Sequence, residues 1–390
     1  MNLTPIRKLV RKTKQMDPRN LGRDSFIYID ISSIDKDTKL ITNPQKLIVD
    51  EAPSRARKEI RANDVLVATV RPNLNGVAIV PSRFDCQIAS TGFCVLRVDY
   101  ALLDPQYLFY FVQTNYLVSR LTMLSIGAGY PAVSDDNILD SLIPLPPLQE
   151  QRRIAGILAK ADRLRRLRRT ARQLSDTYLQ SVFMDMFGDT LLGLTDIPLV
   201  PLEEVCSKIT DGTHVTPKYL ENGIPFVSIK DLTKIPGQID FSDVKYISRA
   251  EHEWISKLSN VEKGDILYTK VGSYGIAQLV NTEIEFSIFV SIALLKPDKS
   301  KIIPKFFESV LKTDFIKRQA DRLVSGIGVP DLHLREIKTF VLPLPPMNIQ
   351  KEFVEIALLY ERFRKQQIEA SRQSEMLFQS LLQRAFAGEV

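Results

Sequence analysis

The spacing of hydrophobic and polar residues changes twice along the chain, and it changes in the same way each time. Short β-branched or aromatic runs, such as "FIYIDISSI" in residues 1–147 and "DILYTKV" in residues 190–346, are separated by Pro, Gly and Asn. Such runs are typical of short strands in an irregular mixed domain. In residues 148–189 and 347–390 the apolar positions instead recur every three or four residues, which predicts one long helix after each domain.

The same sequence skeleton occurs twice in the chain. The run "PLPP" at 144–147 returns at 343–346, and the same offset relates Gln151 to Gln350. A duplication of this size differs from a solenoid, which is built from more and shorter repeats. We therefore predict a mixed α/β (α+β) fold: two repeated globular domains, 1–147 and 190–346, joined by an antiparallel pair of long helices, 148–189 and 347–390.

Each long helix would expose a continuous apolar stripe if it stood alone. One heptad register fits both helices, so we expect them to bury these stripes against each other as a pseudo-two-fold coiled coil. Each helix would be roughly 55–60 Å long at the usual rise per residue. The proline run before each helix ends any earlier helix and turns the chain out of its domain. The residues expected in the core of the helix pair are Ile154, Ile157, Leu164, Tyr178, Phe353, Ile356, Phe363, Leu377 and Leu381.

Composition narrows the class of protein only a little. Lys and Arg number 52 against 46 Asp and Glu, and a net charge of +6 is compatible with nucleic-acid binding but is weak evidence alone. The cysteines Cys86, Cys94 and Cys206 are scattered, so we expect neither a disulfide framework nor a metal site. No apolar run approaches the length of a membrane span and no signal-peptide core follows the N-terminus, which favours a cytoplasmic protein without membrane contact.

Several longer segments together resemble a known family. They are "IPLPPLQEQRRIAGIL" at 143–158, "LPLPPMNIQKEFVEIA" at 342–357 and "ITDGTHVTPKYLENGIPFVSIKDL" at 209–232, with "IGAGYP" and "GIGVP" before the two proline runs. In combination, and across the whole chain, they resemble the specificity subunit of type I restriction–modification systems.

The resemblance implies a bacterial or archaeal subunit without catalytic residues. Two target-recognition domains would each read one half of a bipartite, asymmetric sequence in double-stranded DNA. The paired helices would set the length of the unread spacer and dock two modification (methyltransferase) subunits. Those partners would carry S-adenosylmethionine and methylate adenine, while restriction subunits, with ATP and Mg, would join the complex through them. The chain itself would bind no cofactor.

Candidate DNA-binding residues lie on loops, where Arg, Lys, Asn, Ser, Thr and His side chains match the donors and acceptors of base edges. The segments "VRPNLNG" and "TKVGSYG" follow corresponding strands, although an ordinary turn explains them about equally well. With "TDGTH", they supply the base-readout candidates Arg71, Asn73, Asn75, Thr210, Thr213, His214, Lys270, Ser273 and Tyr274. The phosphate-contact candidates are Arg55, Arg57, Lys58, Arg61, Lys218 and Lys230.

Three further features of the sequence allow more than one interpretation. The arginine-rich run of the first helix, 152–172, is either a solvated helix face or a surface for spacer phosphates or an acidic partner. Asp331, Glu336 and Lys338 follow the order of a metal-dependent nuclease motif, but the other copy lacks its Glu-x-Lys, so we expect no catalytic site. A coiled-coil scaffold that pairs proteins without reading DNA is the alternative function.

Overall fold

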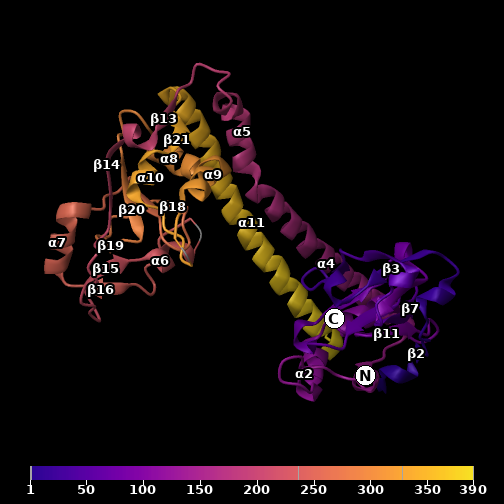
Figure 1. The fold of residues 1–390 in the computed structure, drawn as a ribbon. Coiled ribbons are helices and arrows are strands. Elements are labelled where there is room, and N and C mark those ends of the chain that lie inside the picture. The colour runs from indigo at the N-terminus through magenta and orange to yellow at the C-terminus, as the bar shows by residue number, and fades with distance from the viewer. Residues whose placement is uncertain (1, 236, 327, 390) are drawn as a thin grey trace. The chain divides into compact units, whose positions relative to one another are not determined.

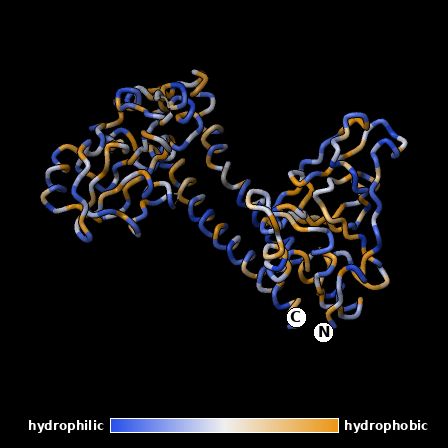
Figure 2. The backbone as a smooth tube through the Cα atoms, turned by 60° about the horizontal axis from the view of Figure 1, so that its bottom comes forward, coloured by the Kyte–Doolittle hydropathy of each residue, from blue (hydrophilic) through white to orange (hydrophobic). Residues whose placement is uncertain are grey.

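The computed structural model describes residues 2–235, 237–326 and 328–389 (Figure 1). The chain divides into two compact units, each assembled from one globular domain and the helix segments that pack on it. Unit 1 comprises Met1–Arg172 with Gln367–Val390, and unit 2 comprises Gln173–Gln366. Hydrophobic stretches of the chain run through the interior of each unit (Figure 2).

Unit 1 contains twelve of the described strands and three short helices. Its strands are β1 (Leu3–Pro5), β2 (Val10–Arg11), β3 (Ser25–Ile29), β4 (Ile34–Asp35), β5 (Leu40–Ile41), β6 (Gln45–Ile48), β7 (Ala56–Ile60), β8 (Val65–Ala68), β9 (Val77–Ile79), β10 (Gln87–Ser90), β11 (Phe93–Val98) and β12 (Leu142–Pro144). Its helices are α1 (Pro105–Phe111), α2 (Asn115–Leu124) and α3 (Asp135–Leu139). The first part of α4 (Leu148–Asp176) and the last part of α11 (Met347–Ala387) complete it.

Unit 2 has fewer of the described strands and more of the described helices than unit 1. Its strands are β13 (Leu199–Pro201), β14 (Cys206–Asp211), β15 (Ile224–Val227), β16 (Lys245–Ile247), β17 (Ile266–Thr269), β18 (Ala277–Leu279), β19 (Ser287–Ile288), β20 (Ile292–Pro297) and β21 (Val341–Pro343). Its helices are α5 (Tyr178–Leu191), α6 (Ile229–Thr233), α7 (Arg249–Ser259), α8 (Pro304–Leu311), α9 (Asp314–Leu323) and α10 (Leu334–Lys338), with the first part of α11.

The sheet topology confirms the predicted duplication. The strand order β2-β11-β8-β9 in unit 1 corresponds to β14-β20-β17-β18 in unit 2, and the pair β1-β12 corresponds to β13-β21. A second sheet, β6-β3-β10-β7, corresponds to β16-β15-β19, and in both sheets one neighbouring pair is parallel. The mixed α/β class with two repeated domains is therefore correct. One difference is plain: in unit 2 the segment corresponding to β7 forms the helix α7.

Each proline run leaves its domain as a strand and is fastened by the glutamine that follows it. Gln151 is fully buried; its Oε1 accepts from the amide of Asp104 (2.9 Å), and its Nε2 donates to the carbonyls of Leu102 (3.0 Å) and Pro146 (2.9 Å). Gln350 makes the same three contacts, with Ile303, Lys301 and Pro345. The repeated glutamine thus satisfies three buried backbone groups where each long helix starts.

The long helices pair in an antiparallel way within unit 2. Tyr178 stacks on Tyr360 (ring centroids 5.9 Å apart), and Phe183 packs edge-on against Phe353 (6.2 Å). Residue numbers therefore rise along α5 while those of the contacting residues on α11 fall, as in an antiparallel pair. The predicted continuous first helix is interrupted at residue 177. The first copy has Asp-Thr at 176–177, both weaker helix formers than the Glu-Met of the second copy, where α11 continues.

The expected core of the helix pair is only partly correct. Ile154 and Phe353 are fully buried, and Ile157, Ile356 and Leu381 are half-buried. Burial of four other residues was wrongly expected, because their exposed fractions are 40% for Leu164, 51% for Tyr178, 50% for Phe363 and 47% for Leu377. Tyr178 still contacts the other helix through Tyr360, at the exposed edge of the pair. The buried positions of α11 include instead Ala357, Ser374, Phe378, Leu382 and Ala385. A strict heptad drifts away from the stripe of a nearly straight helix, which has more than 3.5 residues per turn.

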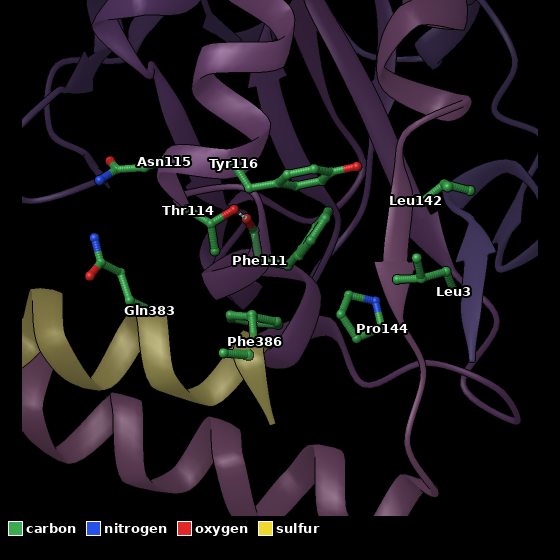
Figure 3. A pocket seen from close by; sticks show the side chains of 10 residues that line it. Leu3, Phe111, Thr114, Asn115, Tyr116, Leu142, Pro144, Gln383 and Phe386 are labelled. Carbon is green, nitrogen blue, oxygen red and sulfur yellow. Dashed lines mark hydrogen bonds between the residues drawn. The ribbon is translucent and has the colours of Figure 1, made fainter. Parts of the chain in front are cut away.

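The C-terminal end of α11 is buried mainly by the globular part of unit 1. The ring of Phe386 lies 4.9 Å from that of Tyr107 and 5.4 Å from that of Phe111. Beside it is a largely apolar pocket of about 470 Å³, which Tyr116 and Leu142 also line (Figure 3). Tertiary packing on the domain therefore decides which face of this helix segment is buried, and a pattern shared by the two helices does not reveal it.

Candidate nucleic-acid interface

Two loops that the sequence singled out separately meet in unit 1. The turn after β8 carries Arg71, whose amide donates to the carbonyl of Pro131 in the glycine–proline loop (2.7 Å). The amide of Val133 donates to the carbonyl of Thr69 (2.9 Å), and the Arg71 guanidinium lies 4.6 Å above the ring of Tyr130. Arg71 and Asn73 are exposed, and Tyr130 is 73% exposed. The joined loops present a cation, an amide and an aromatic ring to solvent.

The same joint is built in unit 2. There the amide of Gly272 donates to Pro330 (2.8 Å), and the amide of Leu332 donates to Lys270 (2.9 Å). The glycine–proline loop needs its glycine: Gly326 has φ +111°, and a Cβ there would lie 2.3 Å from the carbonyl oxygen of Val329. The two units therefore present one backbone framework with different side chains on it.

The second glycine-containing segment, "TDGTH", reaches this joint through an ion pair. Asp211, at the end of β14, places its Oδ2 3.3 Å from Nζ of Lys270 and its Oδ1 3.3 Å from Nε2 of His214. Gly212 is required by close approach, because a Cβ would meet the carbonyl oxygen of Ile288 at 2.1 Å. Asp211 was not among the predicted site residues; its position between two candidate loops is visible only in three dimensions.

Four base-readout candidates have side chains engaged within their own unit. In unit 1, Nδ2 of Asn75 donates to Val112 (3.2 Å) and its Oδ1 is buried, so this side chain faces the domain. In unit 2, Lys270 is 6% exposed and held by Asp211, and Thr213 is 8% exposed with its hydroxyl bonded to Val215. The hydroxyl of Tyr274 donates to Asp321 (2.8 Å). Each of these side chains completes a turn or an ion pair, so base readout by them stays a prediction with less support than for the exposed candidates.

The remaining base-readout candidates stay predictions. Arg71, Asn73, His214 and Ser273 are exposed, and Thr210 is half-buried next to the end of β14. Exposure on the joined loops is the condition that a side chain must meet to reach a base edge. The candidate site of unit 1 is therefore Arg71 with Asn73, and that of unit 2 is His214 with Ser273.

Most of the phosphate-contact candidates are already neutralised by acidic side chains. Their partners are Asp17 for Arg57 (3.7 Å), Asp135 for Lys58 (2.6 Å), Glu59 for Arg61 (3.3 Å) and Asp243 for Lys230 (3.2 Å). The Lys58 side chain is only 13% exposed, which makes it a structural residue. Arg55 and Lys218 are exposed, and they remain the stronger candidates because a solvent-facing cation can reach a phosphate.

Several side chains of the arginine-rich helix face form ion pairs within unit 1. Arg165, with its side chain 11% exposed, binds Asp162 (2.7 Å) and Glu375 (3.2 Å) and lies 3.9 Å over the ring of Phe378. Arg166 also pairs with Asp162, and Arg169 pairs with Asp37 on the turn between β4 and β5. Arg165 therefore fastens α4 to α11 and Arg169 fastens it to the domain, whereas Arg166 is held within α4.

Lys39, on the same turn, makes the stability of unit 1 depend on pH. Its Nζ donates to the carbonyl of Asn75 (2.6 Å), while burial and then the nearby Arg165 lower its pKa from 10.5 to about 8. Asp37, Asp35 and Glu375 act in the opposite direction.

Between about pH 8 and 10.5 the unfolded chain keeps this lysine protonated more fully than the folded chain does, so the free energy of unfolding should rise across that window. The variant Lys39→Arg stays charged in both states and should lack the rise. Thermal unfolding of both proteins at several pH values checks this prediction. An equal rise in the variant would show that other groups cause it.

The nuclease-like segment is structural as well. Glu336 accepts the amide of His333 (2.8 Å) and so caps the start of α10. Among residues 2–235, 237–326 and 328–389, no group of three or more His, Cys, Asp or Glu side chains is placed to hold a metal ion. In the same residues, no helix is both long and apolar enough to cross a membrane.

Sequence comparison identifies both repeats with one kind of domain. The profile of the type I restriction modification DNA specificity domain matches residues 20–173 and 196–372. The EcoBI specificity subunit of Escherichia coli is 25% identical over 312 residues, which are 72% of this chain and 65% of that protein. The MjaVIII specificity subunit of Methanocaldococcus jannaschii is 25% identical over 317 residues, which are 74% of this chain and 72% of that protein. The chain thus spans less than two thirds of the E. coli relative.

Solved structures agree with this result. A chain from a study of complex assembly and conformational transition of the type I R-M system aligns with a TM-score of 0.66 and 27% identity, covering 100% of this chain and 98% of that one. The S subunit from M. genitalium aligns with a TM-score of 0.55 and 18% identity over 99% of this chain and 96% of that one, which supports the fold alone.

Proposed function

The chain belongs to the family of type I restriction–modification DNA specificity domains, and from this premise we propose that it reads DNA for partner subunits and performs no chemistry itself. Each unit contacts one half of a bipartite target in double-stranded DNA. The observation that carries the proposal is the loop joint built in both units with different exposed side chains, Arg71 and Asn73 in one and His214 and Ser273 in the other. Different side chains on the same backbone framework suit a target whose two halves differ in sequence.

The scaffold alternative is less well supported. It explains the paired helices, but it assigns no role to the two loop joints. The family match covers most of both domains and the first part of the helix that follows each, and its description names DNA specificity. We therefore keep DNA reading as the function and treat the helices as the part of the chain that meets other proteins.

Two modification subunits are the proposed protein partners, and restriction subunits join through them. An apolar surface on the helix pair of unit 2 supports this docking: Leu174, Leu359 and Phe363 are 70%, 65% and 50% exposed and line one pocket with Tyr178. Exposed apolar groups gathered in this way mark interaction sites. S-adenosylmethionine for adenine methylation, and ATP with Mg for restriction, belong on those partners in this proposal, in a bacterial or archaeal cytoplasm.

The half-site prediction tests the function. The target is first found by sequencing methylated adenines in cells that produce the chain together with modification subunits. Duplexes with one half-site scrambled then measure discrimination at each half separately. Arg71→Ala with Asn73→Ala should lower discrimination at one half-site by roughly 10- to 100-fold, the usual cost of lost base contacts, and leave the other half-site unchanged.

Arg83→Ala is the matched control. Arg83 is also exposed and also lies over an aromatic ring, that of Phe84, but it follows β9 at the opposite end of the β8–β9 hairpin. Its removal should leave both half-sites unchanged. Equal loss at both half-sites in the Arg71 variant would indicate damage to the fold, and a wild-type protein that prefers neither half-site would refute DNA reading.

A further inference from the structure

The helix α7 is the main structural difference between the two units. It lies between β16 and β17, at the place where the chain of unit 1 forms β7 between β6 and β8. It is anchored to the sheet by His252, which is 8% exposed and whose Nδ1 lies 2.9 Å from the hydroxyl of Ser287 in β19. Ile255, 2% exposed, adds an apolar contact. The helix is therefore a rigid platform that only unit 2 possesses.

One carboxylate joins this platform to a candidate reading loop. Oε2 of Glu251 accepts from the amide (3.3 Å) and the hydroxyl (3.0 Å) of Ser248, which forms the N-terminal capping box of α7. Its Oε1 accepts the amide of Lys218 (2.9 Å), in the loop that follows "TDGTH". These bonds hold the pKa of Glu251 below its usual value, the bond from Lys218 contributing most, so the group is ionised at neutral pH.

The loop has fixed ends and an exposed middle. At its start, Thr213 donates to Ile288 (3.2 Å) and accepts from Val290 (3.1 Å). At its end, the amide of Leu220 donates to Tyr246 (2.9 Å). His214, Val215 and Thr216, between these points, are exposed, and Val215 is 62% exposed. After the tip, Pro217 is buried, and the bond from the next residue, Lys218, to Glu251 holds the C-terminal side of the tip.

We propose that Glu251 is a positioning residue for DNA recognition: it fixes the loop tip at His214–Thr216 against α7 so that unit 2 meets its half-site with a preformed surface. The inference rests on the proposed function and adds the element that distinguishes the two half-sites. A loop held in its binding conformation loses less conformational freedom on binding, and its side chains meet the groove in one arrangement. Unit 1 holds the corresponding loop differently: there the amide of Met16 donates to the carbonyl of Arg57 in β7 (2.8 Å), so backbone and not a carboxylate makes the attachment.

The variant Glu251→Gln separates the tether from the helix cap. A glutamine at this position still accepts from Ser248, because the capping box takes Glu or Gln. Its amide group then turns toward the Lys218 amide, and two donors face each other. Discrimination at the half-site read by unit 2 should fall by about tenfold, the equivalent of one charged hydrogen bond, with no change at the other half-site. The variant Glu253→Gln, the same change on the exposed face of α7, should alter neither.

Hydrogen exchange of the free protein gives a readout that needs no DNA. The Lys218 amide should exchange faster in Glu251→Gln than in the wild type or in Glu253→Gln, while the unfolding temperature stays the same. Unchanged exchange would overturn the tether. Faster exchange with unchanged discrimination, or equal loss at both half-sites, would overturn the positioning role. A wild-type protein that discriminates at neither half-site would fail the proposed function itself, a result distinct from all of these.

Discussion

Replacing Phe353 by alanine should lower the free energy of unfolding of unit 2 by about 3–5 kcal/mol, the usual cost of removing a buried aromatic ring. Phe353 is fully buried on α11 and touches three other rings, those of Phe183 (6.2 Å), Phe187 (5.9 Å) and Phe306 (5.6 Å). The ring therefore holds α11 to α5 and to α8 at once. Denaturant unfolding, followed by a probe in unit 2, measures the loss.

Phe363→Ala on the same helix is the control. This ring is 50% exposed, so its removal should change the stability of unit 2 by less than about 1 kcal/mol. Because Phe363 belongs to the apolar surface proposed for docking, the same variant should weaken binding of modification subunits. Equal destabilisation by both variants would mean that the heptad register expected from the sequence, which buries both rings, describes the protein better than the buried stripe of the structure.

The architecture could be predicted from the sequence because the two copies can be compared with each other, which shows the segments that both domains share. The PLPP runs, the glutamines that follow them and the strand-like segments coincide at one offset, and the two sheets of unit 2 reproduce the order of their counterparts. The helix register failed for a physical reason. The segments that face a globular domain are buried by that domain, as Phe386 is by Tyr107 and Phe111, and a two-helix pattern ignores this contribution.

The candidate site was predicted at the level of segments and less well at the level of side chains. "VRPNLNG", "TKVGSYG", "TDGTH" and the glycine–proline loops do come together. Which side chain points outward depends on pairings across tens of residues, such as Lys270 with Asp211, that spacing alone does not show. One missed element did have a local signal. Ser248 followed three positions later by Glu251 is a capping-box pattern, and it marks the start of α7.

The glutamine that follows each proline run should be the most sensitive polar residue of its unit. Gln151→Met keeps the size of the side chain but leaves the Asp104 amide and the carbonyls of Leu102 and Pro146 without partners in a buried site. Each unsatisfied group costs about 1–3 kcal/mol, so we expect unit 1 to lose about 3–5 kcal/mol, a large part of the usual margin of about 5–15 kcal/mol. Thermal unfolding with a probe in unit 1 measures the change.

Gln149→Met, two positions earlier on an exposed site, is the matched control and should have almost no effect. The comparison also tests why the proline run and its glutamine occur in both repeats. If the glutamine fixes the angle at which α4 leaves the domain, Gln151→Met should also reduce target discrimination under conditions in which unit 1 remains folded. A loss below about 1 kcal/mol would show that water or a small shift of the loop satisfies the three groups, and that the proline strand alone directs the helix.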